Sequence, residues 1–362
     1  MTKAEEGMKV TVYGGKADQI RKTAMELILA SHPSECTGCP KYGKCELQSM
    51  YQFLGAGPER WRKQSRSLPN DDSNPMIQHL FTRCVRCGRC VRACHDLRGA
   101  GVLDFIKDES GIHAGVPEGK SLAEAGCRFC GACIEVCPTG SIVDAVGMIR
   151  ENQPYAESVV PCKSACPAHI DIPRYIRYVK DGEFAKAAAV IREKVPFPLT
   201  LGSICNHACE QDCKRNYLGS PVSICSLKLA AASLDDDTWK SRRIRHAPTG
   251  RRAAVIGAGP AGLTAAYYLA KQGHEVTVYE ANEKAGGQCR YGIPAYRLPD
   301  ELLDREIADV LEMGIRLKTS CPVNTPKELL EQDFDTVLTA IGTHEGSRLP
   351  LKGNTLHRRS AG

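Results

Sequence analysis

The sequence lacks a long apolar run, has few aromatic residues (6%), and carries little net charge. A membrane-spanning helix needs about 20 consecutive apolar residues, and none of the 362 residues lies in such a run, so we expect no membrane partner. Residues 1–6 lack the basic and apolar stretches of an export signal, which predicts a cytoplasmic protein. The formal net charge of +6 is spread along the chain, so we expect no nucleic-acid partner.

Cysteine, by contrast, is abundant: the chain has 19. Because a reducing cytosol disfavours disulfides, cysteines in this number indicate metal binding or redox chemistry. They form three groups, at residues 36–45, 84–137 and 162–225, and two more, Cys289 and Cys321, stand alone. We assign no role to these two, since an isolated cysteine is usually a small buried hydrophobic residue.

The middle group repeats the spacing Cys-x2-Cys-x2-Cys-x3-Cys, which is typical of bacterial ferredoxins with two 4Fe-4S clusters. In such proteins the fourth cysteine of each run binds the cluster of the other run. The first predicted ligand set is therefore Cys84, Cys87, Cys90 and Cys137. The second predicted set is Cys94, Cys127, Cys130 and Cys133. Zinc is the alternative, but it pairs two CxxC motifs and has no use for the crossed spacing.

Four arginines alternate with the cysteines of the first run: Arg83, Arg86, Arg89 and Arg92. Positive charge near a cluster favours its reduced form, and it can attract an acidic protein. We therefore expect ferredoxin as a partner. A solvated loop surface is the alternative interpretation of the same residues.

Upstream of both runs, an imidazole and three thiolates occur at close spacing: His32, Cys36, Cys39 and Cys45. This group predicts a third 4Fe-4S cluster, in which a histidine ligand changes the net charge and hence the potential. Taken alone, a histidine before a proline is more often a surface residue. The segment 32–48, however, resembles the one-His, three-Cys motif of the large iron-sulfur subunit of respiratory complex I and of iron-only hydrogenases. That resemblance implies that His32 is a ligand.

The resemblance covers about residues 7–150, and residues 7–10 resemble the end of the 2Fe-2S domain that precedes the motif in that family. The cysteines of that domain are absent, as are the hydrogenase and molybdopterin domains. We therefore expect a chain that transfers electrons rather than one that activates hydrogen or formate. The partners implied are a complex I-like NADH-oxidising flavin subunit, a 2Fe-2S subunit and a catalytic oxidoreductase subunit.

The third group comprises Cys162, Cys166, Cys205, Cys209, Cys213 and Cys225. It resembles the N-terminal iron-sulfur domain of the NADPH-dependent glutamate synthase small subunit, which dihydropyrimidine dehydrogenase and bifurcating transhydrogenases share. That family carries two 4Fe-4S clusters, but here an upstream CxxC is missing and Leu201 replaces a cysteine. The resemblance implies one cluster on Cys166, Cys205 and Cys209, with Cys225 or Cys213 as the fourth ligand. A further cluster with non-cysteine ligands and a set of buried free thiols are the alternatives.

A glycine-rich turn follows a predicted strand at 253–257 and precedes a predicted helix, while a second strand at 275–280 ends in an acidic residue. This context is typical of a dinucleotide-binding turn, in which a pyrophosphate lies at the helix N-terminus and the acidic side chain accepts hydrogen bonds from a ribose. The residues are Gly257, Gly259, Pro260, Ala261, Gly262 and Glu280.

Two later segments, 285–299 and 339–343, resemble the glutamate synthase small subunit next to its FAD. They add Gly287, Gln288, Arg297 and Gly342 as candidate contacts and favour FAD over NAD. For Arg297 a surface ion pair is the alternative. The resemblance stops near residue 353, before that family's NAD(P)H domain, so we expect either a truncated product or a partner chain that completes the FAD domain. We predict no NAD(P)H site in this chain.

We therefore predict an α+β multidomain protein: a one-His/three-Cys cluster domain (1–60), a ferredoxin-like domain with two 4Fe-4S clusters (61–150), a helical iron-sulfur domain (151–245), a partial Rossmann-like FAD domain (250–353) and a tail (354–362). Its predicted function is electron transfer in a cytoplasmic NAD(P)H-linked, electron-bifurcating oxidoreductase. The alternatives are an NADPH-oxidising subunit that feeds a glutamate synthase-like reductase, and a non-catalytic iron-sulfur relay or scaffold. Locally, we expect a helix at 17–31, a connection at 51–82 and helical structure at 170–194.

Overall fold

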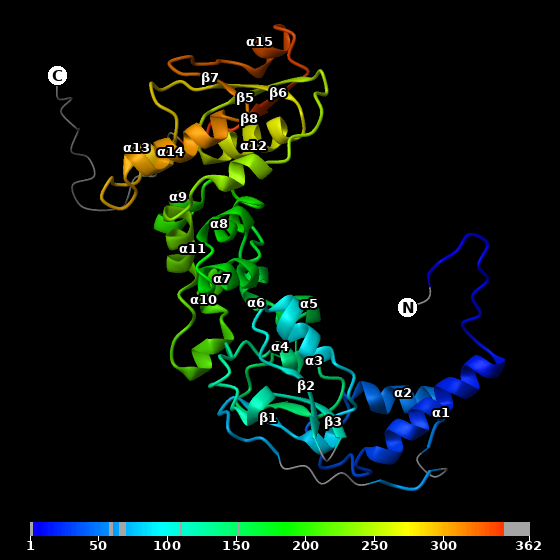
Figure 1. Cartoon of the computed structure of the whole chain (residues 1–362). Helices are drawn as coiled ribbons and strands as arrows, with labels where there is room; N and C mark the ends of the chain where they lie inside the picture. Colours follow the sequence, from blue (N-terminus) through cyan, green and yellow to red (C-terminus); the bar gives the residue numbers. More distant parts are fainter. Residues whose placement is uncertain (1–2, 58–60, 65–69, 109–110, 151, 344–362) are drawn as a thin grey trace, which may run out of the picture. The chain divides into compact units, whose positions relative to one another are not determined.

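The computed structural model describes residues 3–57, 61–64, 70–108, 111–150 and 152–343, apart from the side chain of Arg242. The predicted tail at 354–362 and the last ten residues of the predicted FAD domain lie outside this range. The chain divides into two compact units (Figure 1). Unit 1 comprises the chain up to Asp181 together with His207–Ile224, and unit 2 comprises Gly182–Asn206 together with the chain from Cys225. The predicted helical domain therefore contributes to both units.

Unit 1 begins with two helices, α1 (Gly15–Ser31) and α2 (Glu46–Leu54). They pack together through Met25, Leu29 and Leu47, which are buried. The predicted helix at 17–31 is thus confirmed. The predicted connection at 51–82 was too long, because α2 continues to Leu54 and a strand begins at Ile77. The helix ends at Gly55, whose positive φ of 55° suits a residue without a side chain.

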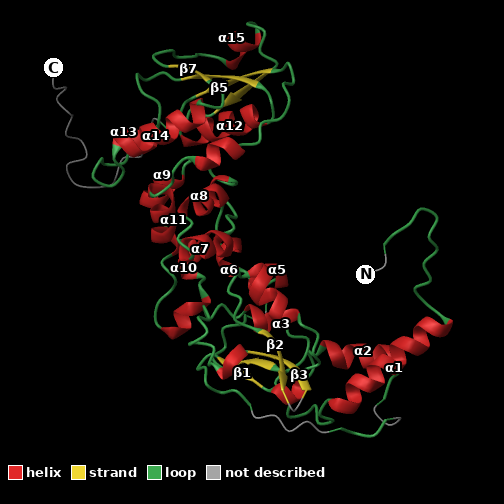
Figure 2. Ribbon diagram, in the orientation of Figure 1, coloured by secondary structure: helices red, strands yellow, loops and turns green. Residues whose placement is uncertain are grey.

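The ferredoxin-like part of unit 1 holds two small antiparallel sheets, which Figure 2 shows in yellow. One pairs β1 (Ile77–His79) with β4 (Ile142–Asp144), and the other pairs β2 (Asp104–Asp108) with β3 (Gly111–Gly115). Each cysteine run enters a short helix, α3 (Arg89–Arg92) or α4 (Ala132–Glu135). Both helices follow a left-handed glycine with φ of 69°, Gly88 and Gly131, so the repeated sequence produces a repeated local structure.

The remaining elements of unit 1 are helical. They are a π-helical turn, η3 (Ala93–Leu97), the short 3-10 turns η2 (Phe81–Arg83), η4 (Pro117–Gly119) and η5 (Lys214–Leu218), and the helices α5 (Tyr155–Val159), α6 (Pro161–Ser164), α7 (Ile172–Lys180) and α10 (Ala208–Gln211). Tyr175 of α7 is fully buried, and its hydroxyl donates to the carbonyl of Ile224 at 2.8 Å. This bond ties the end of the unit's second chain segment to its first.

Unit 2 is built on a parallel sheet in the order β7-β6-β5-β8. The strands are β5 (Arg252–Ile256), β6 (Glu275–Tyr279), β7 (Arg316–Lys318) and β8 (Thr336–Thr339). The crossover helix α12 (Pro260–Lys271) packs on β5 and β6 and against α14 (Asp300–Leu311). The two predicted strands and the helix between them are confirmed. The protein is therefore mixed α/β, with ferredoxin-like and partial Rossmann-like parts.

The other helices of unit 2 are α8 (Phe184–Arg192), α9 (Pro198–Ile204), α11 (Ile224–Ser233), α13 (Gln288–Tyr291) and α15 (Pro326–Leu330). The helical structure predicted at 170–194 is present as two helices, α7 and α8, because Gly182 adopts a positive φ of 74° between them. None of the helices in the described parts of the chain combines the length and apolar character needed to span a bilayer.

Candidate functional site

The first predicted ferredoxin-like ligand set surrounds one cavity in unit 1. Cys84, Cys87, Cys90 and Cys137 all line it. Burial, reinforced by the thiols of Cys84, Cys137 and Cys87, raises the pKa of Cys90 to about 12. Such a group of thiols ionises when a metal centre supplies the compensating positive charge. The structure thus brings together the four cysteines of the crossed spacing.

The same cavity is lined by His79, which the sequence analysis missed. Its side chain is 5% exposed, and its Nε2 has no hydrogen-bond partner among the described residues. Burial, aided by His113 and opposed by Asp71, lowers the pKa of His79 to about 4, so the imidazole is neutral. A buried polar atom without a partner is costly. A cluster sulfur in this cavity would accept a hydrogen bond from Nε2, so the cavity fits a sulfur-rich group.

The second predicted set is also grouped. Burial raises the pKa of the Cys133 thiol far above its ordinary value, and Cys130, Cys127, Cys90 and Cys94 raise it further. Burial likewise raises the pKa of Cys127 to about 12, with Cys130 and Cys94 among its neighbours. Because Cys90 of the first set lies near Cys133 of the second, the two predicted clusters are neighbours.

The spacing within these groups bears on the zinc alternative. Within the described part of the chain, no three His, Cys, Asp or Glu side chains converge closely enough to hold a single metal ion. Zinc binds thiolates at about 2.3 Å, which brings their sulfur atoms to roughly 4 Å from one another. In a 4Fe-4S cluster each thiolate binds a different iron, so the sulfurs stand farther apart. Clusters are favoured over zinc ions by the crossed Cys-x2-Cys-x2-Cys-x3-Cys spacing.

The His32 loop lies beside the first ferredoxin-like set. His32 is buried, and its Nδ1 donates a hydrogen bond to the carbonyl of Pro33 at 3.0 Å. The proton therefore lies on Nδ1, and Nε2 is the nitrogen that could bind a metal. The thiol of Cys45 contacts the carbonyl of Pro138 at 3.6 Å. A Cβ on Gly140 would come within 2.7 Å of Cys39 Sγ. The third predicted cluster would therefore adjoin Cys137, a ligand of the first.

The cysteines of the third group are divided between the two units. Cys166, Cys209 and Cys213 belong to unit 1, whereas Cys205 and Cys225 belong to unit 2. In unit 2 the Cys225 thiol donates to the carbonyl of Gly202 at 3.4 Å. The ligand set proposed for this group stays a prediction.

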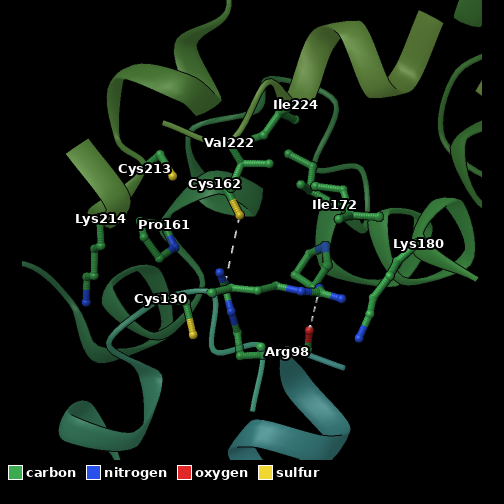
Figure 3. A pocket seen from close by; sticks show the side chains of 14 residues that line it. Arg98, Cys130, Pro161, Cys162, Ile172, Lys180, Cys213, Lys214, Val222 and Ile224 are labelled. Atoms are coloured by element: carbon green, nitrogen blue, oxygen red, sulfur yellow. Dashed lines mark hydrogen bonds between the residues drawn. The ribbon is translucent and has the colours of Figure 1, made fainter. Parts of the chain in front are cut away.

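Within unit 1, Cys162 occupies a cavity of about 290 Å³ that it shares with Cys213, Cys130 and Arg98 (Figure 3). Burial raises the pKa of the Cys162 thiol against the effect of Arg98. The Cys130 thiol differs: burial would raise its pKa, but the charge of Arg98 and hydrogen bonds from the Ala132 backbone and from Arg98 bring it below the ordinary value. Neither Arg98 nor Cys162 was among the predicted site residues.

In unit 2 the glycine-rich turn borders a cavity of about 450 Å³. The predicted contacts that line it are Gly257, Gly259, Pro260, Ala261, Glu280, Gly287, Gln288 and Gly342. Arg297 is exposed and is not among its lining residues. Gly262 also lies outside the lining, but a Cβ there would come within 1.9 Å of the Gly257 carbonyl oxygen, so its role is to let α12 pack close to β5.

The backbone around this cavity is shaped for close approach. Gly257 has a φ of 103°, and a Cβ there would meet the carbonyl of Ala340 at 2.4 Å. Gly287, with a φ of 52°, lies so near the turn that a Cβ would come within 2.7 Å of Gly259 Cα. Because α12 begins at Pro260, its first N–H groups and the positive end of its dipole border the cavity, which suits a pyrophosphate.

Glu280 is 5% exposed, and its carboxylate holds the loops on both sides of the cavity. One oxygen accepts from the N–H of Ala258 at 2.8 Å, and the other accepts from the N–H and side-chain amide of Asn282, each at 2.9 Å. A carboxylate offers about four acceptor positions, so capacity remains for a ribose hydroxyl. The residues present fit a dinucleotide.

Four family models match consecutive parts of the chain. Residues 21–60 match the NADH-ubiquinone oxidoreductase-G iron-sulfur binding region, and residues 74–143 match the ferredoxin-like domain of NADH-quinone oxidoreductase subunit 3. Residues 153–238 match the 4Fe-4S domain II of dihydropyrimidine dehydrogenase, and residues 255–306 match an NAD(P)-binding Rossmann-like domain. The resemblances of the iron-sulfur parts to the complex I large subunit and to dihydropyrimidine dehydrogenase are thereby confirmed.

Three curated relatives are subunits of oxidoreductases. The beta subunit of an NADP(+)-dependent formate dehydrogenase from Moorella thermoacetica is 36% identical over 53% of this chain and 31% of its own length. The beta subunit of an NADPH-Fe(3+) oxidoreductase from Geobacter sulfurreducens is 37% identical over 53% of this chain and 30% of its own length. Subunit PreT of the NAD-dependent dihydropyrimidine dehydrogenase from Salmonella typhimurium is 36% identical over 54% of this chain and 49% of its own length.

The chain therefore matches about a third to a half of the length of these relatives. Iron-sulfur domains and a Rossmann-like domain relate it to subunits of iron-sulfur oxidoreductases.

Proposed function

We propose that this chain is an electron-transfer subunit of an NAD(P)H-linked oxidoreductase complex, in which it relays single electrons through a series of 4Fe-4S clusters. The observation that carries the proposal is the succession of predicted ligand sets in unit 1. Cys39 and Cys45 adjoin residues 138–140, directly after the first set's Cys137, and Cys90 of that set lies near Cys133 of the second. Neighbouring clusters are what a relay requires.

The cavity of unit 2 supports a dinucleotide as a further electron carrier of this chain. FAD is the proposed occupant, because the segments 285–299 and 339–343 resemble the FAD-binding part of the glutamate synthase small subunit. A flavin would supply the exchange between paired electrons from a hydride and single electrons for clusters. The chain's own contribution is to bind the pyrophosphate at α12 and the ribose near Glu280. NAD(P), for which the matching family model is named, is the alternative occupant.

The finer proposal is an electron-bifurcating complex in the cytoplasm. Its proposed partners are an NADH-oxidising flavin subunit, a 2Fe-2S subunit, ferredoxin and a catalytic oxidoreductase subunit. The relatives' names support the class of partner, since each is a subunit of an oxidoreductase. The second candidate function, an NADPH-oxidising subunit for a glutamate synthase-like reductase, leaves the His32 loop and both ferredoxin-like runs without a purpose.

The test is the content of iron, acid-labile sulfide and flavin per chain in anaerobically purified protein, with the intact mass of the same sample. About 12 iron atoms would indicate the three clusters of residues 32–137, about 16 would add one cluster at 162–225, and about 20 would add two. NAD(P)H or reduced ferredoxin should then reduce the clusters through bound flavin or an added flavin subunit. A protein that no such donor reduces would be a scaffold, and the proposed function would fail.

A further inference from the structure

Among the described residues, Arg98 lies beside one predicted ligand of the second ferredoxin-like cluster, Cys130. It stands four residues after Cys94, just past η3, and its side chain enters the 290 Å³ cavity between Cys130 and Cys162 (Figure 3). Its Nη1 donates to Cys162 Sγ at 3.8 Å, and the Cys130 thiol lines the same cavity beside the guanidinium. Arg98 is thus held between a predicted cluster ligand and a thiol outside every predicted ligand set.

The other cations of this cavity are engaged differently. Lys214 is buried and pairs with Glu135 at 3.1 Å, so its charge is offset. Arg128 donates to the carbonyls of Arg98 and Gly99, which supports the backbone of Arg98. Lys180 is exposed, so water screens its charge. Only the guanidinium of Arg98 is described as donating to sulfur in this cavity.

Among the described residues that line the cavity of the first ferredoxin-like set, none is an arginine or a lysine. Cys87 corresponds to Cys130 in the spacing, but Cys87 is exposed. The nearest guanidinium contact there is the exposed Arg92, which donates to the backbone carbonyl of Cys87 at 3.4 Å rather than to its sulfur. Equal ligand spacing is therefore combined with unequal electrostatic surroundings.

We propose that Arg98 is a positioning residue that raises the reduction potential of the cluster held by Cys94, Cys127, Cys130 and Cys133. When this cluster accepts one electron from a single-electron donor, such as a neighbouring cluster, its net charge becomes more negative by one unit and no bond is broken. A partly buried cation beside a ligand sulfur stabilises that added charge more than it stabilises the oxidised form.

The inference rests on the ligand sets of the proposed function. The test compares the whole wild-type chain, Arg98→Gln, Arg98→Lys and, as the matched control from the same cavity, Lys180→Gln. Each protein is assayed for iron and titrated potentiometrically with detection by EPR. A Cys130→Ser variant identifies the signal of the second cluster.

In Arg98→Gln, the ratio of reduced to oxidised second cluster should fall at least tenfold at a fixed potential, which corresponds to ~59 mV for one electron. Arg98→Lys should show a smaller fall, because the charge is kept. Lys180→Gln should match the wild type. Unchanged midpoints in an Arg98→Gln protein with full iron content would overturn the inference.

If Arg98→Gln does not retain its iron, the contact between Arg98 and the second cluster is tested in the wild-type protein instead. Pulsed EPR of reduced protein with ¹⁵N-labelled arginine should detect a guanidinium nitrogen coupled to the second cluster, and the coupling should be absent from labelled Arg98→Lys. No coupling in the wild type would overturn the role of Arg98. A wild-type protein that lacks the iron of the second cluster would instead overturn the ligand set and, with it, the proposed function.

Discussion

The two ferredoxin-like runs share one spacing and one backbone geometry, yet their surroundings differ. Gly88 and Gly131 both adopt a φ of 69° before a short helix, so the loops present their cysteines alike. The cavity of the first set is lined by neutral His79, whereas the second set has the cation Arg98 at Cys130. Spacing thus predicts which atoms bind a cluster, while the surroundings of the two predicted clusters differ in a way that the spacing does not predict.

The largest expected effect comes from breaking the crossed pairing. Cys94→Ala should remove the second cluster and about four iron atoms, because Cys94 is the distant ligand of that set. Cys137→Ala should remove the first cluster instead. Iron analysis measures the loss, and alkylation followed by peptide mass spectrometry identifies the thiols that become free.

In Cys94→Ala the newly alkylated residues should be Cys127, Cys130 and Cys133. Alkylation of Cys84, Cys87 and Cys90 in that variant would contradict the crossed pairing. Cys321→Ala, which changes a thiol outside every predicted set, is the matched control and should keep the full iron content.

A smaller effect is expected from His79, which should act on the first cluster alone. His79→Phe removes the only ring nitrogen that the described residues leave without a partner in this cavity. A hydrogen bond to a cluster sulfur favours the reduced form, so the midpoint potential of the first cluster should fall in this variant. The ratio of reduced to oxidised first cluster at a fixed potential should change less than the tenfold expected for the second cluster in Arg98→Gln. Potentiometric EPR titration measures the shift.

His79→Gln, which keeps a donor, should restore most of the wild-type midpoint. A shift of the second cluster in His79→Phe, or an equal shift in His79→Gln, would show that the histidine acts through packing and not through a hydrogen bond.

The smallest effect is expected from the exposed arginines of the first run. Arg89 is partly exposed and pairs with Glu46 through two contacts of 2.7 and 2.8 Å. Because Glu46 offsets the charge of Arg89 and water screens it, Arg89→Gln should change the ratio of reduced to oxidised first cluster less than twofold. Raising the salt concentration should remove the difference between this variant and the wild type. A large, salt-independent shift would show that surface charge matters as much as Arg98 does.

The prediction from sequence succeeded where chemistry depends on near neighbours in the chain. The strand, turn and helix at 252–271 form as expected because Gly257 and Gly262 permit contacts that any side chain would block. The helix at α1 also formed as predicted. The connection at 51–82 was misjudged, because the last turn of α2 carries no strong signal before Gly55.

Residues that act from a distance escaped the prediction. His79 stands in a strand five residues before the first run, and Arg98 stands four residues after a run, where a basic residue has no special meaning by itself. Each gains its role when the fold carries it to a cysteine cavity. Cys162, one thiol among six in its group, could not be separated from its neighbours by spacing.

By itself, the sequence determined the kind of the predicted sites and their candidate residues, because loops that hold a cluster or a pyrophosphate need particular residues at short, regular intervals. Only the tertiary structure decided the surroundings of those sites: the neutral imidazole at the first ferredoxin-like set, the guanidinium at the second, and the closeness of Cys90 to Cys133. The physical reason is that ligand geometry is local in the chain, whereas burial and electrostatic interaction depend on distances in space that folding alone establishes.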